Sequence, residues 1–196
     1  MSEYRDRYIG LLRGKVHRDG IDRLIEWMDR TDFFVAPASS RYHLACREGL
    51  VMHSLNVYDA MKARNDRDPQ PENEESLTLV SLLHDLCKAE FYRESTRNRK
   101  NEKTGQWEKV PCYVIEDKFP YGHGEKSVYL IERFVRLKPQ EAIAIRWHMG
   151  GFDDSARGGG SAVSQAFERY PLAVKLHLAD IEATYLMEGG EDEGQD

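Results

Sequence analysis

The stretch Ser81-Leu82-Leu83-His84-Asp85-Leu86-Cys87-Lys88 places an adjacent histidine and aspartate inside an apolar segment. The surrounding residues, from about Ser76 to Ala89, are apolar on most faces, which predicts a central, buried helix. Imidazole and carboxylate side chains are ligands that hold divalent transition metals such as Fe, Mn, Co, Ni or Zn. We therefore expect this helix to deliver His84 and Asp85 to a metal site.

Further candidate ligands occur in other apolar segments: His53, His123, His148 and Asp180. Helical periodicity predicts that these residues lie on or beside helices that begin near Leu50, Gly124, Pro139 and Pro171. Helices that point ligands inward are the usual construction of a metal site in a bundle core. Four histidines and two aspartates suffice for two metal ions if Asp85 bridges them.

This order of residues resembles the HD superfamily of metal-dependent phosphohydrolases. Two further histidines between the His-Asp pair and the distal aspartate are similar to its two-metal branch, which includes HD-GYP-type phosphodiesterases and a few diiron oxygenases. The resemblance covers roughly residues 33 to 186. The segment from Ala36 to Leu55, with His43 inside it, also resembles the start of the HD domain in certain bacterial 3′-to-5′ exoribonucleases. The implied fold is all-α, an HD-domain helical bundle.

The resemblance also assigns roles to the ligands. It implies one metal held by His53, His84, Asp85 and Asp180, and a second held by Asp85, His123 and His148. Two cations would neutralise a phosphate ester, and a hydroxide that bridges them would attack phosphorus.

The expected catalytic residues are Asp85, as the bridging ligand, and Lys88, as a point charge on a phosphate oxygen. Further candidate substrate contacts are Arg146, two residues before His148, and His43. Lys88 and Asp85 are three residues apart, so they share a helix face. The alternative for Lys88 is an ion pair on the helix surface.

The sequence departs from two groups of the HD superfamily, and these differences narrow the range of expected substrates. His148 is followed by Met149-Gly150-Gly151 rather than by His-His-Glu, and no Gly-Tyr-Pro signature follows, so we do not expect cleavage of cyclic di-GMP. Residues 1 to 32 are too short for the nucleic-acid-binding module of the exoribonucleases. The predicted activity is therefore a phosphohydrolase or phosphodiesterase that acts on a nucleotide or a short oligonucleotide. The alternatives are a diiron oxygenase of a small polar substrate and a metal-stabilised nucleotide-binding sensor.

An insertion between two ligand-bearing segments does not read as helical. Residues from about 96 to 120 predict a β-hairpin with a turn at Gly105, which we expect to overhang the site. Its basic residues Arg97, Arg99 and Lys100 are candidates for phosphate recruitment, although a solvated face is the alternative. The loop from Phe152 to Ser164, with three consecutive glycines, is a second candidate lid. Aromatic candidates for stacking on a base, or for the core, are Trp107, Tyr113, Tyr121 and Trp147.

Composition bounds the remaining possibilities. The 196 residues carry a net charge of −6, and five acids in residues 188–196 leave only −1 for the rest. This near-neutral body argues against a duplex-DNA footprint. We expect residues 1–32 to form a helical extension, residues 33–187 to form the HD domain, and residues 188–196 to be a disordered acidic tail. The chain has no membrane-spanning or signal-type apolar run, so we expect a cytoplasmic protein.

Overall fold

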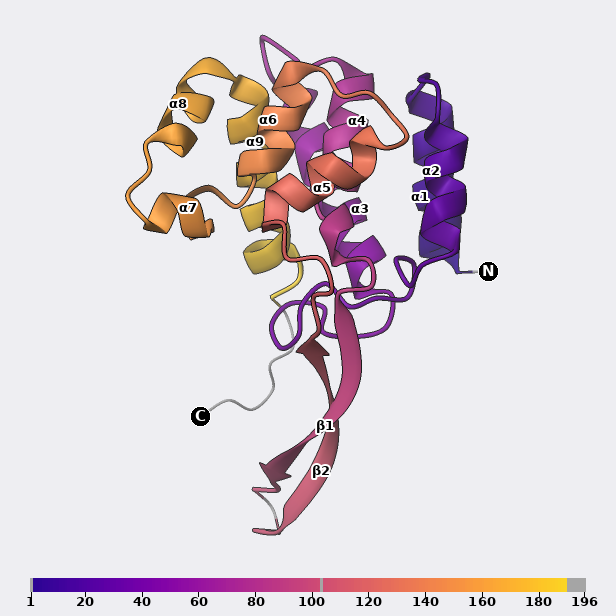
Figure 1. Cartoon of the computed structure of the whole chain (residues 1–196), viewed down its shortest axis with the longest axis vertical. Helices are drawn as coiled ribbons and strands as arrows, with labels where there is room; N and C mark the ends of the chain where they lie inside the picture. The colour runs from indigo at the N-terminus through magenta and orange to yellow at the C-terminus, as the bar shows by residue number, and fades with distance from the viewer. Residues whose placement is uncertain (1, 103, 190–196) are drawn as a thin grey trace.

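The computed structural model describes residues 2–102 and 104–189, and it is mostly helical with one small antiparallel hairpin (Figure 1). This confirms the predicted helical class with a β-hairpin. The helices are α1 Glu3–Lys15, α2 Ile21–Asp29, α3 Gly49–Asn65, α4 Glu74–Leu83, α5 His123–Glu132, α6 Pro139–Trp147, α7 Asp154–Arg157, α8 Ala162–Arg169 and α9 Pro171–Glu182. Shorter turns are η1 Leu86–Lys88, η2 Gly150–Phe152 and the π-helical η3 Ala183–Met187. None of the described helices combines the length and apolar character that a membrane crossing requires.

Helices α3 and α4 form the centre of the helical body. Every residue of α4 from Ser76 to Leu83 is buried, as the apolar sequence predicts. The side chain of Asn73 caps this helix by accepting hydrogen bonds from the N–H groups of Glu75 and Ser76, which satisfies donors that a helix start leaves open. α3 packs against α4, α9 and α1. The candidate ligands on α3, on α9 and directly after α4 are therefore carried by elements that pack together.

The N-terminal helices pack on this centre rather than standing apart from it. The hydroxyl of Tyr8 on α1 is buried and donates to the carbonyl of Leu82 at 2.6 Å. In the linker between α1 and α2, the Arg18 guanidinium donates to both oxygens of Glu141 on α6, at 2.6 and 2.7 Å. The Glu141 side chain is fully buried. Burial raises the pKa of Glu141, but hydrogen bonds from Arg18 and Ser76 outweigh it and lower that pKa.

The hairpin is longer at its start than the sequence indicated. Strand β1 Tyr92–Lys100 pairs antiparallel with β2 Trp107–Ile115, with Tyr92 opposite Ile115 and Lys100 opposite Trp107. Figure 1 shows the ribbon projecting from the helical body with its turn at the far end. The base of the hairpin joins η1 to the loop before α5, so only its root is near the ligand-bearing elements.

Candidate metal centre

The helices α4 and α6 end in the same way, with a histidine side chain hydrogen-bonded to a backbone carbonyl of the last helical turn. The predicted helix from Ser76 to Ala89 ends at Leu83, where the ring Nδ1 of His84 donates to the carbonyl of Ser81 at 2.9 Å. At the end of α6, Nδ1 of His148 donates to the carbonyl of Ile145 at 2.7 Å. A continuing α-helix would give each carbonyl to the N–H four residues on. The histidines take these acceptors themselves, and the sequence reading of one unbroken helix past Asp85 is wrong for this reason.

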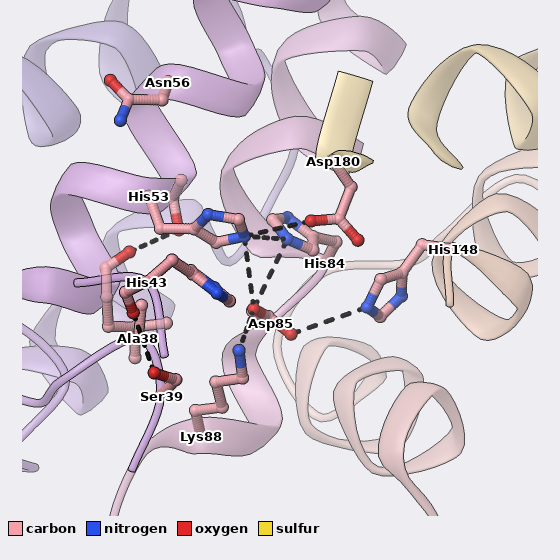
Figure 2. Close-up of polar contacts among 12 residues, drawn as sticks. Ala38, Ser39, His43, His53, Asn56, His84, Asp85, Lys88, His148 and Asp180 are labelled. Atoms are coloured by element: carbon pink, nitrogen blue, oxygen red, sulfur yellow. Dashed lines mark hydrogen bonds and ion pairs between the residues drawn. The ribbon is translucent and has the colours of Figure 1, made fainter. Parts of the chain in front are cut away.

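The structure brings all six predicted ligands together. Figure 2 shows five of them, His53, His84, Asp85, His148 and Asp180, pointing toward one another. They come from α3 (His53), the end of α4 (His84 and Asp85), the first residue of α5 (His123), the end of α6 (His148) and α9 (Asp180). Ligand atoms of His53, His84 and Asp85 lie within 4.8 Å of one another, and so do those of Asp85, His123 and His148. A third such group contains His84, His148 and Asp180.

Asp85 lies between two pairs of histidines. Its Oδ1 is 2.9 Å from Nε2 of His123 and 3.5 Å from Nε2 of His148. Its Oδ2 is 3.6 Å from Nε2 of His53 and 3.5 Å from Nε2 of His84. The two oxygens of one carboxylate thus face two separate imidazole pairs. This is the arrangement that a carboxylate needs in order to bridge two cations.

The hydrogen bonds made by His84 and His148 leave a lone pair on Nε2 of each ring, on the side that faces the other candidate ligands. His84 and His148 use Nδ1–H as donors to backbone carbonyls, so in the neutral rings Nε2 carries the lone pair. Nε2 of His84 lies 3.3 Å from Nε2 of His53, and two lone pairs at that distance require a proton or a metal between them. Nε2 of His148 is buried and has no hydrogen-bond partner in the described chain, although it faces the Asp85 carboxylate. A buried polar atom without a partner is rare, and a cation here would satisfy it. The donor set therefore fits divalent metal ions.

Two glycines beside the ligands allow close packing at the centre. A Cβ built on Gly124, the residue after His123, would lie 2.3 Å from the carbonyl oxygen of Arg146. Gly150 has φ +54, and a Cβ there would lie 2.5 Å from the ring of His177. His177 in turn donates from Nδ1 to the carbonyl of His148 at 2.6 Å. The side chain of His177 therefore stabilises the end of α6.

Electrostatics at the centre are dominated by buried carboxylates. Burial lowers the pKa of His53, but Asp180 and Glu188 outweigh it and raise that pKa to about 9. Burial lowers the pKa of His84 to about 4. Burial raises the pKa of the Asp85 carboxyl, yet the Lys88 ammonium and the surrounding histidines hold it well below its usual range. Negative charge thus persists in a buried site, and a cation or a proton on His53 balances it.

Lys88 lies against the bridging carboxylate. Its Nζ is 2.7 Å from Oδ2 of Asp85, and its side chain is only 12% exposed. Burial lowers the pKa of Lys88, but Asp85 outweighs that effect and raises it above its usual value. The amine is therefore a fixed positive charge beside the centre. The expected contact between Lys88 and a phosphate oxygen remains a prediction.

The other predicted substrate contacts lie in different surroundings. The ring of His43 is 5.0 Å from that of His53, and its Nε2 is buried without a hydrogen-bond partner among the described residues. Arg146 instead pairs with Glu125 at 2.5 Å and with Asp153 at 2.8 Å. Figure 1 shows β1, which carries Arg97, Arg99 and Lys100, running away from the helical body. The structure therefore brings His43 to the centre and does not bring those three basic residues to it.

The sequence reading missed Glu188, which it placed in a disordered acidic tail. The Glu188 side chain is 1% exposed, and its oxygens lie 3.0 and 3.1 Å from Nδ1 of His53. Nδ2 of Asn56 donates to the same carboxylate at 2.9 Å. Asn56 lies three residues after His53, on the same helix face, so both side chains reach Glu188. The other tail residues, apart from Gly189, lie outside the described ranges.

A cavity of about 800 Å³ opens onto the centre. Its walls include His43, His53, Asp85, Lys88, His123 and Asp180. Phe152 and Arg157, from the second predicted lid, also line it, whereas Arg97 lines a neighbouring cavity. No family model, no curated protein and no solved structure matches this chain. The functional argument therefore rests on the site.

Proposed function

We propose that this chain is a two-metal phosphohydrolase of the HD type that acts on a nucleotide or a short oligonucleotide. The observation that carries the proposal is the position of Asp85, whose two oxygens face two different histidine pairs. His53, His84, Asp85 and Asp180 would hold one divalent cation, and Asp85, His123 and His148 would hold the other. Bound cations would supply charge neutralisation of a phosphate ester and would lower the pKa of a water molecule.

The protein's own residues support an anionic substrate. Lys88 places a buried ammonium group on the cavity wall beside the centre. His43 offers a buried ring nitrogen that has no partner in the described chain and that faces the same cavity. A phosphate oxygen can accept hydrogen bonds from both groups, and the Lys88 ammonium retains donors beyond the one that it gives to Asp85. This charge pattern favours a phosphorylated substrate over the small polar substrate of a diiron oxygenase.

The experiment compares phosphoester hydrolysis with oxygen consumption. Protein purified without chelator is assayed anaerobically with Mn²⁺, Co²⁺ or Ni²⁺ on nucleoside monophosphates, short oligonucleotides and a generic phosphodiester. A parallel assay in air with Fe²⁺ follows oxygen consumption. We expect release of phosphate or diester cleavage without O₂, and its loss in Asp85→Ala. Strict dependence on iron and O₂, with no cleavage of any phosphoester, would instead identify an oxygenase.

A further inference from the structure

The cavity has two chemically different parts. Its floor is the buried cluster of charged and imidazole side chains around Asp85. Three aromatic residues line the same cavity yet remain exposed: Tyr42 at 79%, Phe152 at 49% and Tyr185 at 64%. Residues that line a cavity while staying exposed lie at its mouth. We call these three residues the aromatic rim.

The rim is assembled from distant parts of the chain. Tyr42 lies in the loop before α3, Phe152 in η2 and Tyr185 in η3. A single exposed aromatic residue is ordinary on a protein surface, but apolar side chains gathered at one concave site usually mark a ligand. The cavity volume of about 800 Å³ lies in the range of small-molecule sites, and it exceeds what a phosphate group alone would fill.

An arginine side chain lines the same cavity as the aromatic rim. Arg157 lines the cavity and is exposed. A guanidinium plane stacks on flat rings and also donates hydrogen bonds to their edges. None of the four aromatic residues named from the sequence as stacking candidates lines this cavity: Trp107, Tyr113, Tyr121 and Trp147. Tyr113 lines the neighbouring cavity with Arg97. The aromatic residues best placed to stack on a base are therefore those at the mouth of the cavity rather than those named from the sequence.

We propose that the aromatic rim binds the nucleobase of the substrate by stacking, while the phosphate lies on the floor beside Lys88. This inference rests on the proposed function for the floor, and it adds the ligand class that the rim accepts. Stacking on aromatic side chains tolerates different bases, because every base has a flat face. The rim thus selects nucleotides over phosphorylated sugars with little preference among the bases.

Binding of two non-hydrolysable ligands tests the rim without using turnover. One is the 5′-phosphonate analogue of adenosine monophosphate, and the other is the matching phosphonate of ribose, which lacks the base. We expect the nucleoside ligand to bind the metal-loaded protein at least tenfold more tightly in calorimetric titrations, which is the size that stacking of one base supplies. The combined variant Tyr42→Ala, Phe152→Ala and Tyr185→Ala should remove this difference and leave the affinity for the ribose ligand within twofold.

Matched variants control for general effects of losing an apolar side chain. Leu186 is 79% exposed beside Tyr185 but does not line the cavity, and Trp107 is 72% exposed on the hairpin. Leu186→Ala and Trp107→Ala should keep the full preference for the nucleoside ligand. Circular dichroism and metal content verify that the triple variant remains folded and loaded.

The outcomes test base binding by the aromatic rim separately from phosphoester hydrolysis at the metal centre. Equal affinity for both ligands in the unmodified protein, or a preference that survives the triple variant, would overturn the rim proposal even if phosphoesters are hydrolysed. Loss of the preference in Trp107→Ala would also overturn it and would assign base binding to the hairpin. A base preference that depends on the rim, without hydrolysis of any phosphoester, would support the rim and contradict the proposed reaction.

Discussion

The carboxylate of Glu188 lies 3.0 Å from Nδ1 of His53, although 135 residues separate them along the chain. This contact fixes which ring nitrogen of His53 carries hydrogen and turns Nε2 toward Asp180, 3.2 Å away. A carboxylate that holds the outer nitrogen of a metal-binding histidine orients the ring and raises its basicity. We therefore expect Glu188 to position His53 for a metal ion.

Glu188→Gln should weaken metal binding. The amide oxygen can still accept from Nδ1–H, but it lacks the charge that makes the ring a better donor to a cation. Loss of such an outer contact typically costs 10–100-fold in metal affinity. Competition with a fluorescent chelator measures this. Glu182→Gln is the matched control, because Glu182 pairs with Arg64 on the surface of α9. Equal affinity in both variants would show that Glu188 does not act through His53.

Asp85→Ala and His148→Ala should differ in how many metals they remove. Asp85 faces both histidine pairs, so its loss should empty both sites and abolish activity. His148 lies near only one oxygen of Asp85, so its loss should weaken only the second metal. Metal analysis of the two purified variants distinguishes them. Full metal content in Asp85→Ala would remove the bridging role from this residue.

Gly124→Ala should disturb the second metal through packing alone. The added Cβ would meet the carbonyl oxygen of Arg146 at 2.3 Å, so α5 must move away from α6 and carry His123 with it. We expect at least a tenfold loss of affinity for this second metal and little change in affinity for the first. Gly151→Ala is the control, because nothing lies within 4 Å of a Cβ at that position. Identical metal titrations for the two variants would show that this close approach does not position His123.

The ion pair of Arg18 and Glu141 should stabilise the fold independently of the metals. Arg18→Ala removes the cation that contacts both oxygens of a fully buried carboxylate and leaves it only weaker partners such as the Ser76 hydroxyl. Breaking a buried ion pair in this way typically costs roughly 3–5 kcal/mol. For a chain of this size, Tm should fall by about 10 °C. Arg13→Ala is the control, because Arg13 pairs with Asp22 at an exposed site worth about 0–1 kcal/mol. Thermal unfolding that is the same in both variants would contradict the account.

The direction of the pKa shift of Glu141 predicts how the stability contributed by its ion pair with Arg18 depends on pH. The pKa of Glu141 is lowered in the folded protein below its ordinary 4.5. Its contribution to the free energy of unfolding is therefore complete above about pH 4.5 and is lost as the pH falls through the lower, folded value. Unfolding of the metal-free protein between pH 7 and pH 3 should show a smaller loss of stability in Arg18→Ala than in the unmodified chain. Parallel curves would contradict the assignment.

Sequence patterns predicted the helical class and the convergence of the ligands, because the apolar segments around His53, His84 and Asp180 have the period of buried helices. They did not predict where those helices end. His84 and His148 take backbone carbonyls that a continuing helix would use, and helical periodicity does not register that competition. Glu188 was missed because it was grouped with the acids that follow it, Glu191 to Glu193, and a charge run normally indicates solvent rather than a buried contact.

The number of metal ions per chain tests the central claim most directly. Protein purified without chelator, then incubated with Mn²⁺, Fe²⁺ or Co²⁺ and freed of excess ion, is analysed by inductively coupled plasma mass spectrometry. Because Asp85 presents one oxygen to each histidine pair, we expect close to two ions per chain. A ratio that stays at or below one under all three conditions would contradict the two-metal centre and the hydrolytic function proposed from it.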